Sequence, residues 1–146
     1  MTDSIDTRVE ARIEEWAADP AHLDAEIDML ADVLQAVVNA GASVSFYTPF
    51  SIDDARAFWM NKVLPQVREG KRRVLVARTN EGIVGTVQLE LEMPPNQQHR
   101  GAVAKLLVHP KARRRGLARA LMIELEKIAL SEGRTLLTLD TVSGSN

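Results

Sequence analysis

A run of basic residues is the part of the chain whose residue types most clearly suit binding chemistry. Five of the nine residues from Lys111 to Arg119 are Lys or Arg, in a chain whose formal net charge is −2. Two small residues, Gly116 and Ala118, lie among them. Small residues let a backbone approach a phosphate closely, and arginines add charge-assisted hydrogen bonds. Three interpretations are open: a nucleic-acid patch, a solvated helix start, or a cradle for a small anion.

The basic run lies where a strand is expected to give way to a helix. The stretch "AVAKLLVHP" is rich in apolar residues and closes with Pro110, which predicts a strand. A helix should follow and end near Gly133. The first N–H groups of a helix lack partners and lie at the positive end of its dipole, so a pyrophosphate would fit beside Gly116. The apolar residues that indicate this helix are Leu117, Leu121, Leu125 and Ile128.

Two further helices are expected in the first half of the chain. Residues 19–20, Asp then Pro, are typical of a helix start, and apolar residues then recur every three or four positions until Gly41. Ser51, with an aspartate three residues later, predicts the start of a second helix. Pro65 is expected to kink or break that helix, because proline lacks the backbone N–H and clashes with the preceding turn.

Strands are expected around these helices. Residues 8–13 alternate between apolar and charged, which favours a strand, although the overlapping "EARIEEWA" also suits a helix. The runs "RRVLVA" and "IVGTVQLELEM", joined by "RTNEG", predict a β-hairpin with Gln88 on the polar side of the alternation. "TLLTLDT" predicts a last, buried strand. The order of strand, two helices, three strands, helix and strand predicts one α/β domain over residues 1–146.

These residues and their order resemble the GCN5-related N-acetyltransferase (GNAT) superfamily. "RRRGLA" is similar to its Arg/Gln-x-x-Gly-x-Gly/Ala signature, with Arg113, Gly116 and Ala118 in the fixed positions, and "KLLVHP" looks like its fourth strand. The blocks "GASVSF", "KLLVHPKARRRGLARALM" and "LLTLDTVSGS" are most similar to the tabtoxin-resistance type acetyltransferases. The resemblance implies the acyl-CoA N-acyltransferase fold, in which a mixed, mostly antiparallel sheet is flanked by helices.

The same resemblance implies acetyl-CoA as cofactor and a primary amine of a small molecule as acceptor. Leu106, Leu107 and Val108 would pair with the pantetheine arm, and a bulged strand there would offer an N–H to the thioester carbonyl. Arg119 would assist with the 3′-phosphate. The amine would attack the acetyl carbon directly, without an acyl-enzyme. The residues implied to hold the pyrophosphate are Arg113, Arg114, Arg115, Gly116, Leu117 and Ala118.

The acid–base residues of the family are only partly matched. Asp140 aligns with the family's aspartate on the fifth strand and is the expected catalytic carboxylate, although a structural or substrate-orienting role suits it equally. Ala102 stands where the tabtoxin-resistance type has an acidic residue, so the general base must come from elsewhere. Phe46 and Tyr47 would face the substrate, although aromatic residues that anchor a turn look the same in sequence.

The family pattern extends past the last residue of this chain. After the "GS" that precedes Asn146, the family continues with a helix, whose tyrosine protonates the CoA thiolate, and with two strands. We therefore expect a C-terminally truncated acetyltransferase with an uncovered sheet edge, which would favour a homodimer. A competing hypothesis is a catalytically defective, CoA-binding pseudoenzyme, because both Ala102 and the missing helix remove acid–base groups.

Composition narrows the remaining classes of function. The chain is acidic overall, whereas a nucleic-acid binder of this size would more often be basic. No apolar run approaches the roughly 20 residues that span a bilayer, and the first residues do not form a secretory signal. With no cysteine, disulfides, thiolate metal sites and a cysteine nucleophile are excluded. We expect a cytoplasmic protein that binds no nucleic acid, no membrane and no metal.

Overall fold

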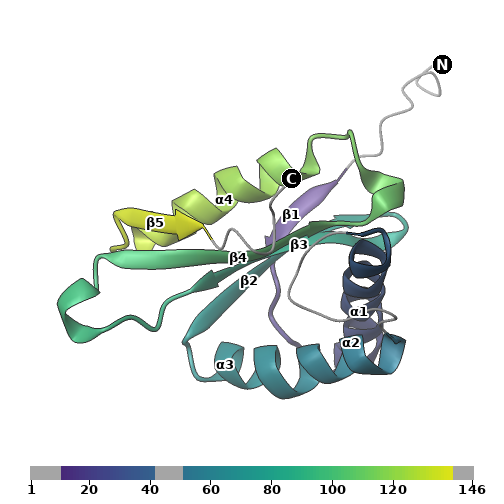
Figure 1. The fold of residues 1–146 in the computed structure, drawn as a ribbon, viewed down its shortest axis with the longest axis horizontal. Helices are drawn as coiled ribbons and strands as arrows, with labels where there is room; N and C mark the ends of the chain where they lie inside the picture. Colours follow the sequence, from purple (N-terminus) through teal and green to yellow (C-terminus); the bar gives the residue numbers. More distant parts are fainter. Residues whose placement is uncertain (1–10, 42–50, 140–146) are drawn as a thin grey trace.

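A five-stranded sheet forms the centre of the protein (Figure 1). The structure is a computed structural model, and it describes residues 11–41 and 51–139. Neighbouring strands are antiparallel except for the parallel last pair. The predicted class, a mostly antiparallel α/β sheet flanked by helices, is therefore confirmed. In their order across the sheet the strands are β1 (Arg12–Glu15), β2 (Arg72–Thr79), β3 (Gly82–Glu90), β4 (Arg100–Val108) and β5 (Leu136–Leu139).

Helices cover both faces of this sheet, as Figure 1 shows. Three of them lie on one side, here called the α1 face, and the fourth lies on the other, here called the α4 face. Alternate residues of a strand point to opposite faces. In β2, Val74 and Val76 accordingly join the core under α1, whereas Leu75 and Ala77 join the core under α4. The helices are α1 (Leu23–Asn39), α2 (Ile52–Phe58), α3 (Leu64–Arg68) and α4 (Leu117–Ser131).

The expected kink at Pro65 takes the form of a wide helical turn. Helix α2 continues through a π-helical turn, Trp59–Val63, directly into α3, which has Pro65 in its first turn. The N–H of Leu64 donates to the carbonyl of Trp59, five residues back. Such a turn holds one extra residue, and it places the proline where a helix start tolerates its missing N–H. The run from α2 to α3 therefore stays helical, and Trp59 is fully buried.

The last described strand is less buried than predicted. Within the described residues, β5 pairs only with β4 and lies at the edge of the sheet. Leu137 packs against the α4 core, but Leu136 and Leu139 are 43% and 66% exposed. The expectation of a buried strand is therefore wrong for this stretch, because only one strand edge and α4 cover it.

A buried polar cluster lies on the α1 face, around a side chain from the polar side of the predicted alternation. Gln88 has no exposed surface, and Arg72 is only 6% exposed. The Arg72 guanidinium donates to Oε1 of Gln88 and, at 2.8 Å, to Oε1 of Gln66 in α3. Its Nη2 lies 3.4 Å from the carboxylate of Glu90. Burial lowers the pKa of Arg72, and the charge of Glu90 opposes that change.

Substitutions in this cluster test its contribution to stability. We expect Arg72→Leu to lower the free energy of unfolding by about 1–3 kcal/mol, because it leaves the carbonyl of Gln88 buried without a donor. The double variant Arg72→Leu/Gln88→Leu should recover much of that loss, since both polar partners are then gone. Urea denaturation measures both values.

The matched control is Lys71→Leu, one residue earlier on the exposed surface. Its ion pairs with Glu69 and Glu92 are solvated, so no measurable loss is expected. Equal losses for Arg72→Leu and Lys71→Leu would contradict a stabilising role of the buried cluster.

Candidate functional site

The junction between β4 and α4 combines three unusual backbone features. The chain leaves β4 through a 3₁₀ turn, Pro110–Ala112, and Arg114 then adopts a positive φ of 67°. Gly116 is the N-cap of α4 and has a φ of 75°. Only glycine adopts this left-handed conformation without steric cost. A Cβ at Gly116 would meet nothing within 4 Å, so the junction is open to an approaching ligand.

The cations of this junction have no carboxylate partners in the part of the chain that the structure describes. Helix α4 also has no acidic residue in its first turn, and Gly116 provides no capping side chain. Some arginines elsewhere have carboxylate partners: Arg73 hydrogen-bonds Glu15 at 2.6 Å and 2.8 Å, which raises its pKa. The uncompensated charges and the positive end of the helix dipole together favour an anion here. The exposed, unpaired arginines are Arg113, Arg114, Arg115 and Arg119.

Strand β4 carries a β-bulge just before this junction. Ala104 pairs with Gln88 and Leu107 with Thr86, so two residues of β4 lie opposite a single residue of β3. Lys105 adopts a positive φ of 53° at this point, which is strained for a residue with a side chain. The bulge that the family resemblance implied is therefore present, and it lies immediately before Leu107.

The two edges of β4 have different described partners. On the β5 side, the described pairing covers Arg100–Val103 opposite Leu136–Leu139. On the β3 side, pairing continues to Val108, and the N–H of His109 donates to the carbonyl of Val84 at 2.8 Å. The segment from Ala104 to Val108 therefore has no described strand on its β5 side.

A carboxylate lies next to the position where the expected acid is missing. Ala102 pairs directly with Glu90 of β3, and paired residues point to the same face, here the α1 face. The small side chain of Ala102 leaves space beside this carboxylate, which Arg72 contacts from β2. Nothing in the motif indicated Glu90, because its position depends on the register of two strands. The predicted Asp140, Phe46 and Tyr47 lie outside the described residues.

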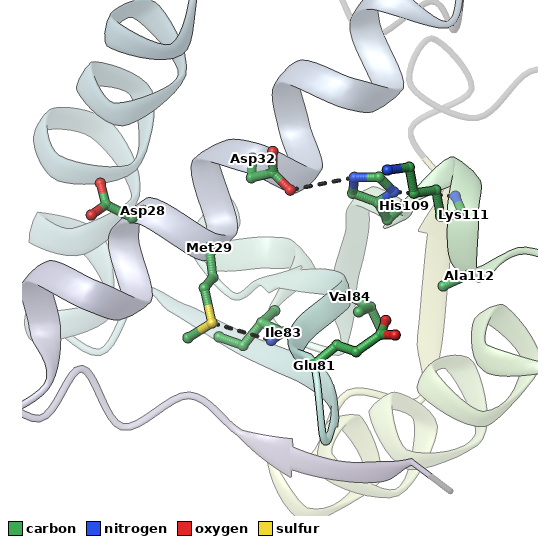
Figure 2. A pocket seen from close by; sticks show the side chains of 9 residues that line it. All are labelled: Asp28, Met29, Asp32, Glu81, Ile83, Val84, His109, Lys111 and Ala112. Carbon is green, nitrogen blue, oxygen red and sulfur yellow. Dashed lines mark hydrogen bonds and ion pairs between the residues drawn. The ribbon is translucent and has the colours of Figure 1, made fainter. Parts of the chain in front are cut away.

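A cavity of about 420 Å³ lies next to the junction on the α1 face. Figure 2 shows the side chains that line it. Its floor is apolar and includes Met29 and Ile83, and its rim is charged. His109, at the end of β4, lies on the rim with Nε2 3.3 Å from a carboxylate oxygen of Asp32 in α1. Lys111, which begins the basic run, also lines the cavity. The cavity therefore adjoins the junction from the side opposite α4.

Three solved structures of acetyltransferases share this fold. An N-acetyltransferase from Staphylococcus aureus Mu50 aligns with a TM-score of 0.66 and 21% identity, over 89% of this chain and 72% of that one. A ribosomal-protein-alanine N-acetyltransferase from Brucella melitensis gives 0.68 and 21%, over 88% and 72%. The PaiA N-acetyltransferase from Thermoplasma acidophilum, solved in complex with coenzyme A, gives 0.61 and 14%, over 86% and 75%.

The length of the helices and the match to a family pattern complete the description of the chain. Of the described helices, none is both long and apolar enough to cross a membrane. The sequence pattern of the acetyltransferase (GNAT) family matches residues 38–146, which include the bulged strand and the basic junction. The chain therefore belongs to the acetyltransferase (GNAT) family.

Proposed function

We propose that this protein binds acetyl-CoA and transfers the acetyl group to a primary amine of a small molecule. The observation that carries the proposal is the junction of β4 and α4, where arginines without a carboxylate partner among the described residues surround the αL residue Gly116, next to the bulged end of β4. A pyrophosphate suits the N-terminus of α4. An extended pantetheine arm suits the edge from Leu106 to Val108. The pyrophosphate and the pantetheine arm of one CoA molecule would therefore bind at adjoining positions.

Individual roles follow from these places. Residues 113–118 would bind the pyrophosphate, and Arg119, one turn into the exposed side of α4, would assist with the 3′-phosphate. The N–H groups at the bulge would polarise the thioester carbonyl. A neutral amine would then attack the acetyl carbon, and its proton would pass to a carboxylate directly or through water. Asp140 is the proposed carboxylate, and Phe46 and Tyr47 the proposed acceptor contacts.

Three finer proposals accompany this function. We place the chain nearest to the tabtoxin-resistance type of the family, on the sequence blocks around residues 41–46, 105–122 and 136–145. We treat residues 1–146 as a single domain of a cytoplasmic enzyme.

A homodimer is supported by the exposed apolar side chains of Leu130 and Leu139, which a second copy would cover. Size-exclusion chromatography with light scattering tests this last proposal.

Ala102 favours a second candidate function, a CoA-binding module without transferase activity. The two candidates differ in one measurement: release of the free CoA thiol in the presence of a panel of amines. Thiol release that depends on the amine supports the transferase. Binding of CoA without any such release supports the binding module.

Binding of acetyl-CoA should raise the melting temperature, and Gly116→Glu should abolish the increase. The substituted carboxylate would occupy the phosphate position and repel the ligand. Gly133→Glu is the matched control, because Gly133 has the same φ of 75°, also meets nothing within 4 Å, and lies at the opposite end of α4. Differential scanning fluorimetry should show the increase for the wild type and for Gly133→Glu. An unchanged wild-type curve at millimolar acetyl-CoA would exclude both functions.

Replacing the proposed proton acceptor should lower turnover more than affinity. We expect Asp140→Asn to reduce kcat at least about 100-fold while leaving CoA binding intact, because loss of a general base typically costs 10²–10⁴-fold. Glu90→Gln is the companion variant, since Glu90 is the carboxylate beside Ala102. A large loss in Glu90→Gln with none in Asp140→Asn would transfer the role to Glu90.

A further inference from the structure

We infer that His109 and Asp32 act as a positioning pair that holds the phosphate-binding loop, residues 110–116, in the conformation that binds the cofactor. The inference rests on the proposed function and adds to it a role for two residues outside the family signature. His109 lies at the last point where the chain is still paired with the sheet. Asp32 belongs to α1, on the other side of the cavity (Figure 2).

Both ring nitrogens of His109 have defined partners. Nδ1 accepts the backbone N–H of Lys111 at 3.1 Å. A neutral imidazole has one acceptor and one donor nitrogen, so the proton must be on Nε2. Nε2 lies 3.3 Å from a carboxylate oxygen of Asp32, within ion-pair distance. The ring therefore connects the start of the loop to helix α1, in the order Lys111, His109, Asp32.

The backbone of His109 strengthens this connection. Its N–H donates to the carbonyl of Val84 in β3 at 2.8 Å, and its carbonyl accepts the N–H of Ala112 at 2.8 Å. The side chain and the backbone of His109 thus both hold the 3₁₀ turn, Pro110–Ala112. Rotation of the imidazole away from Asp32 would release the N–H of Lys111, from which the basic run begins.

Helix α1 is a rigid anchor for the pair. It packs fully buried side chains such as Ile27, Leu30 and Leu34 onto the sheet, so the backbone of Asp32 is fixed. The loop after Ala112 is different, because Arg113, Arg114 and Arg115 are exposed and their side chains form no hydrogen bond or ion pair with other described residues. Ala112 itself is 3% exposed. The loop is therefore held at its start, and its position depends on what holds His109.

A fixed loop should improve binding by lowering the cost of ordering it around phosphates. The direction of the change in CoA affinity distinguishes positioning of the loop from electrostatic repulsion by Asp32. Asp32 is negative and lies near a site for anions, so removing its charge alone should strengthen cofactor binding. Loss of positioning should weaken it. A substitution at Asp32 therefore gives opposite results under the two explanations.

The experiment measures the Kd of CoA by calorimetry for the complete chain, well below the melting temperature of each variant. His109→Ala and Asp32→Ala should each raise Kd roughly 3- to 10-fold, the size of one net hydrogen bond. The double variant should be no weaker than either single variant, because both break the same connection. Asp32→Asn removes the charge but keeps an oxygen beside Nε2, so it should bind CoA at least as tightly as the wild type does.

Two controls isolate the connection. Glu81→Ala removes a negative charge from the same cavity without touching His109, and it should leave Kd unchanged or lower it. His109→Asn keeps an acceptor for the N–H of Lys111 but is too short to bridge to Asp32, so it should bind with an intermediate Kd. In the acetyl-transfer assay, the KM for acetyl-CoA should rise in His109→Ala while kcat stays constant.

The possible failures are distinguishable. If the wild type binds CoA but His109→Ala and Asp32→Ala bind equally well, the positioning pair is refuted and the proposed function stands. Lower melting temperatures with an unchanged Kd would have the same meaning, since the pair would then be only structural. If Asp32→Ala binds CoA more tightly, charge and not positioning is its contribution. A wild type that does not bind CoA would overturn the proposed function and the pair together.

Discussion

The pairing of β3 with β4 is the constraint on which the other features of the site depend. It holds one edge of β4 from Ala102 to Val108 and forces an extra residue into a bulge at Lys105. On the other edge, the described pairing with β5 covers Arg100–Val103. Because cores on both faces hold β3, the bulge stays in place. The position of the bulge in β4 is thus fixed by its rigid partner strand, β3.

Charge is distributed to match this geometry. Two arginines of the sheet, Arg73 and Arg78, form ion pairs with carboxylates of β1, α1 and the end of α4. Those of the junction after β4 have no such partners in the described ranges, although the chain is acidic overall. A surplus of carboxylates elsewhere keeps the net charge low, while a local positive potential remains at the N-terminus of α4. This arrangement favours a compact polyanion over a long one such as nucleic acid.

The parts of the fold that follow local rules were predictable from sequence. The period of Leu117, Leu121 and Leu125 indicates α4, and the glycine before it indicates the αL N-cap. Other features depend on residues distant in sequence. Gln88 alternates with apolar residues and was expected in solvent, but Arg72 and α3 cover it. Likewise, the Glu90–Ala102 and His109–Asp32 neighbours arise only from strand register and helix packing, which no local pattern encodes.

This difference explains why the proposed cofactor-binding part of the site is easier to recognise from sequence than the proposed acceptor-binding part. The bulge, the turn and the helix start are contiguous, within residues 104–119, so one short motif specifies all of them. The candidate acid–base and acceptor residues come from segments far apart, around Glu90, Asp140 and residues 46–47. Each can change independently while the sheet and its bulge remain. A carboxylate lost at one strand position, as at Ala102, can therefore be supplied by a neighbouring strand without altering the cofactor motif.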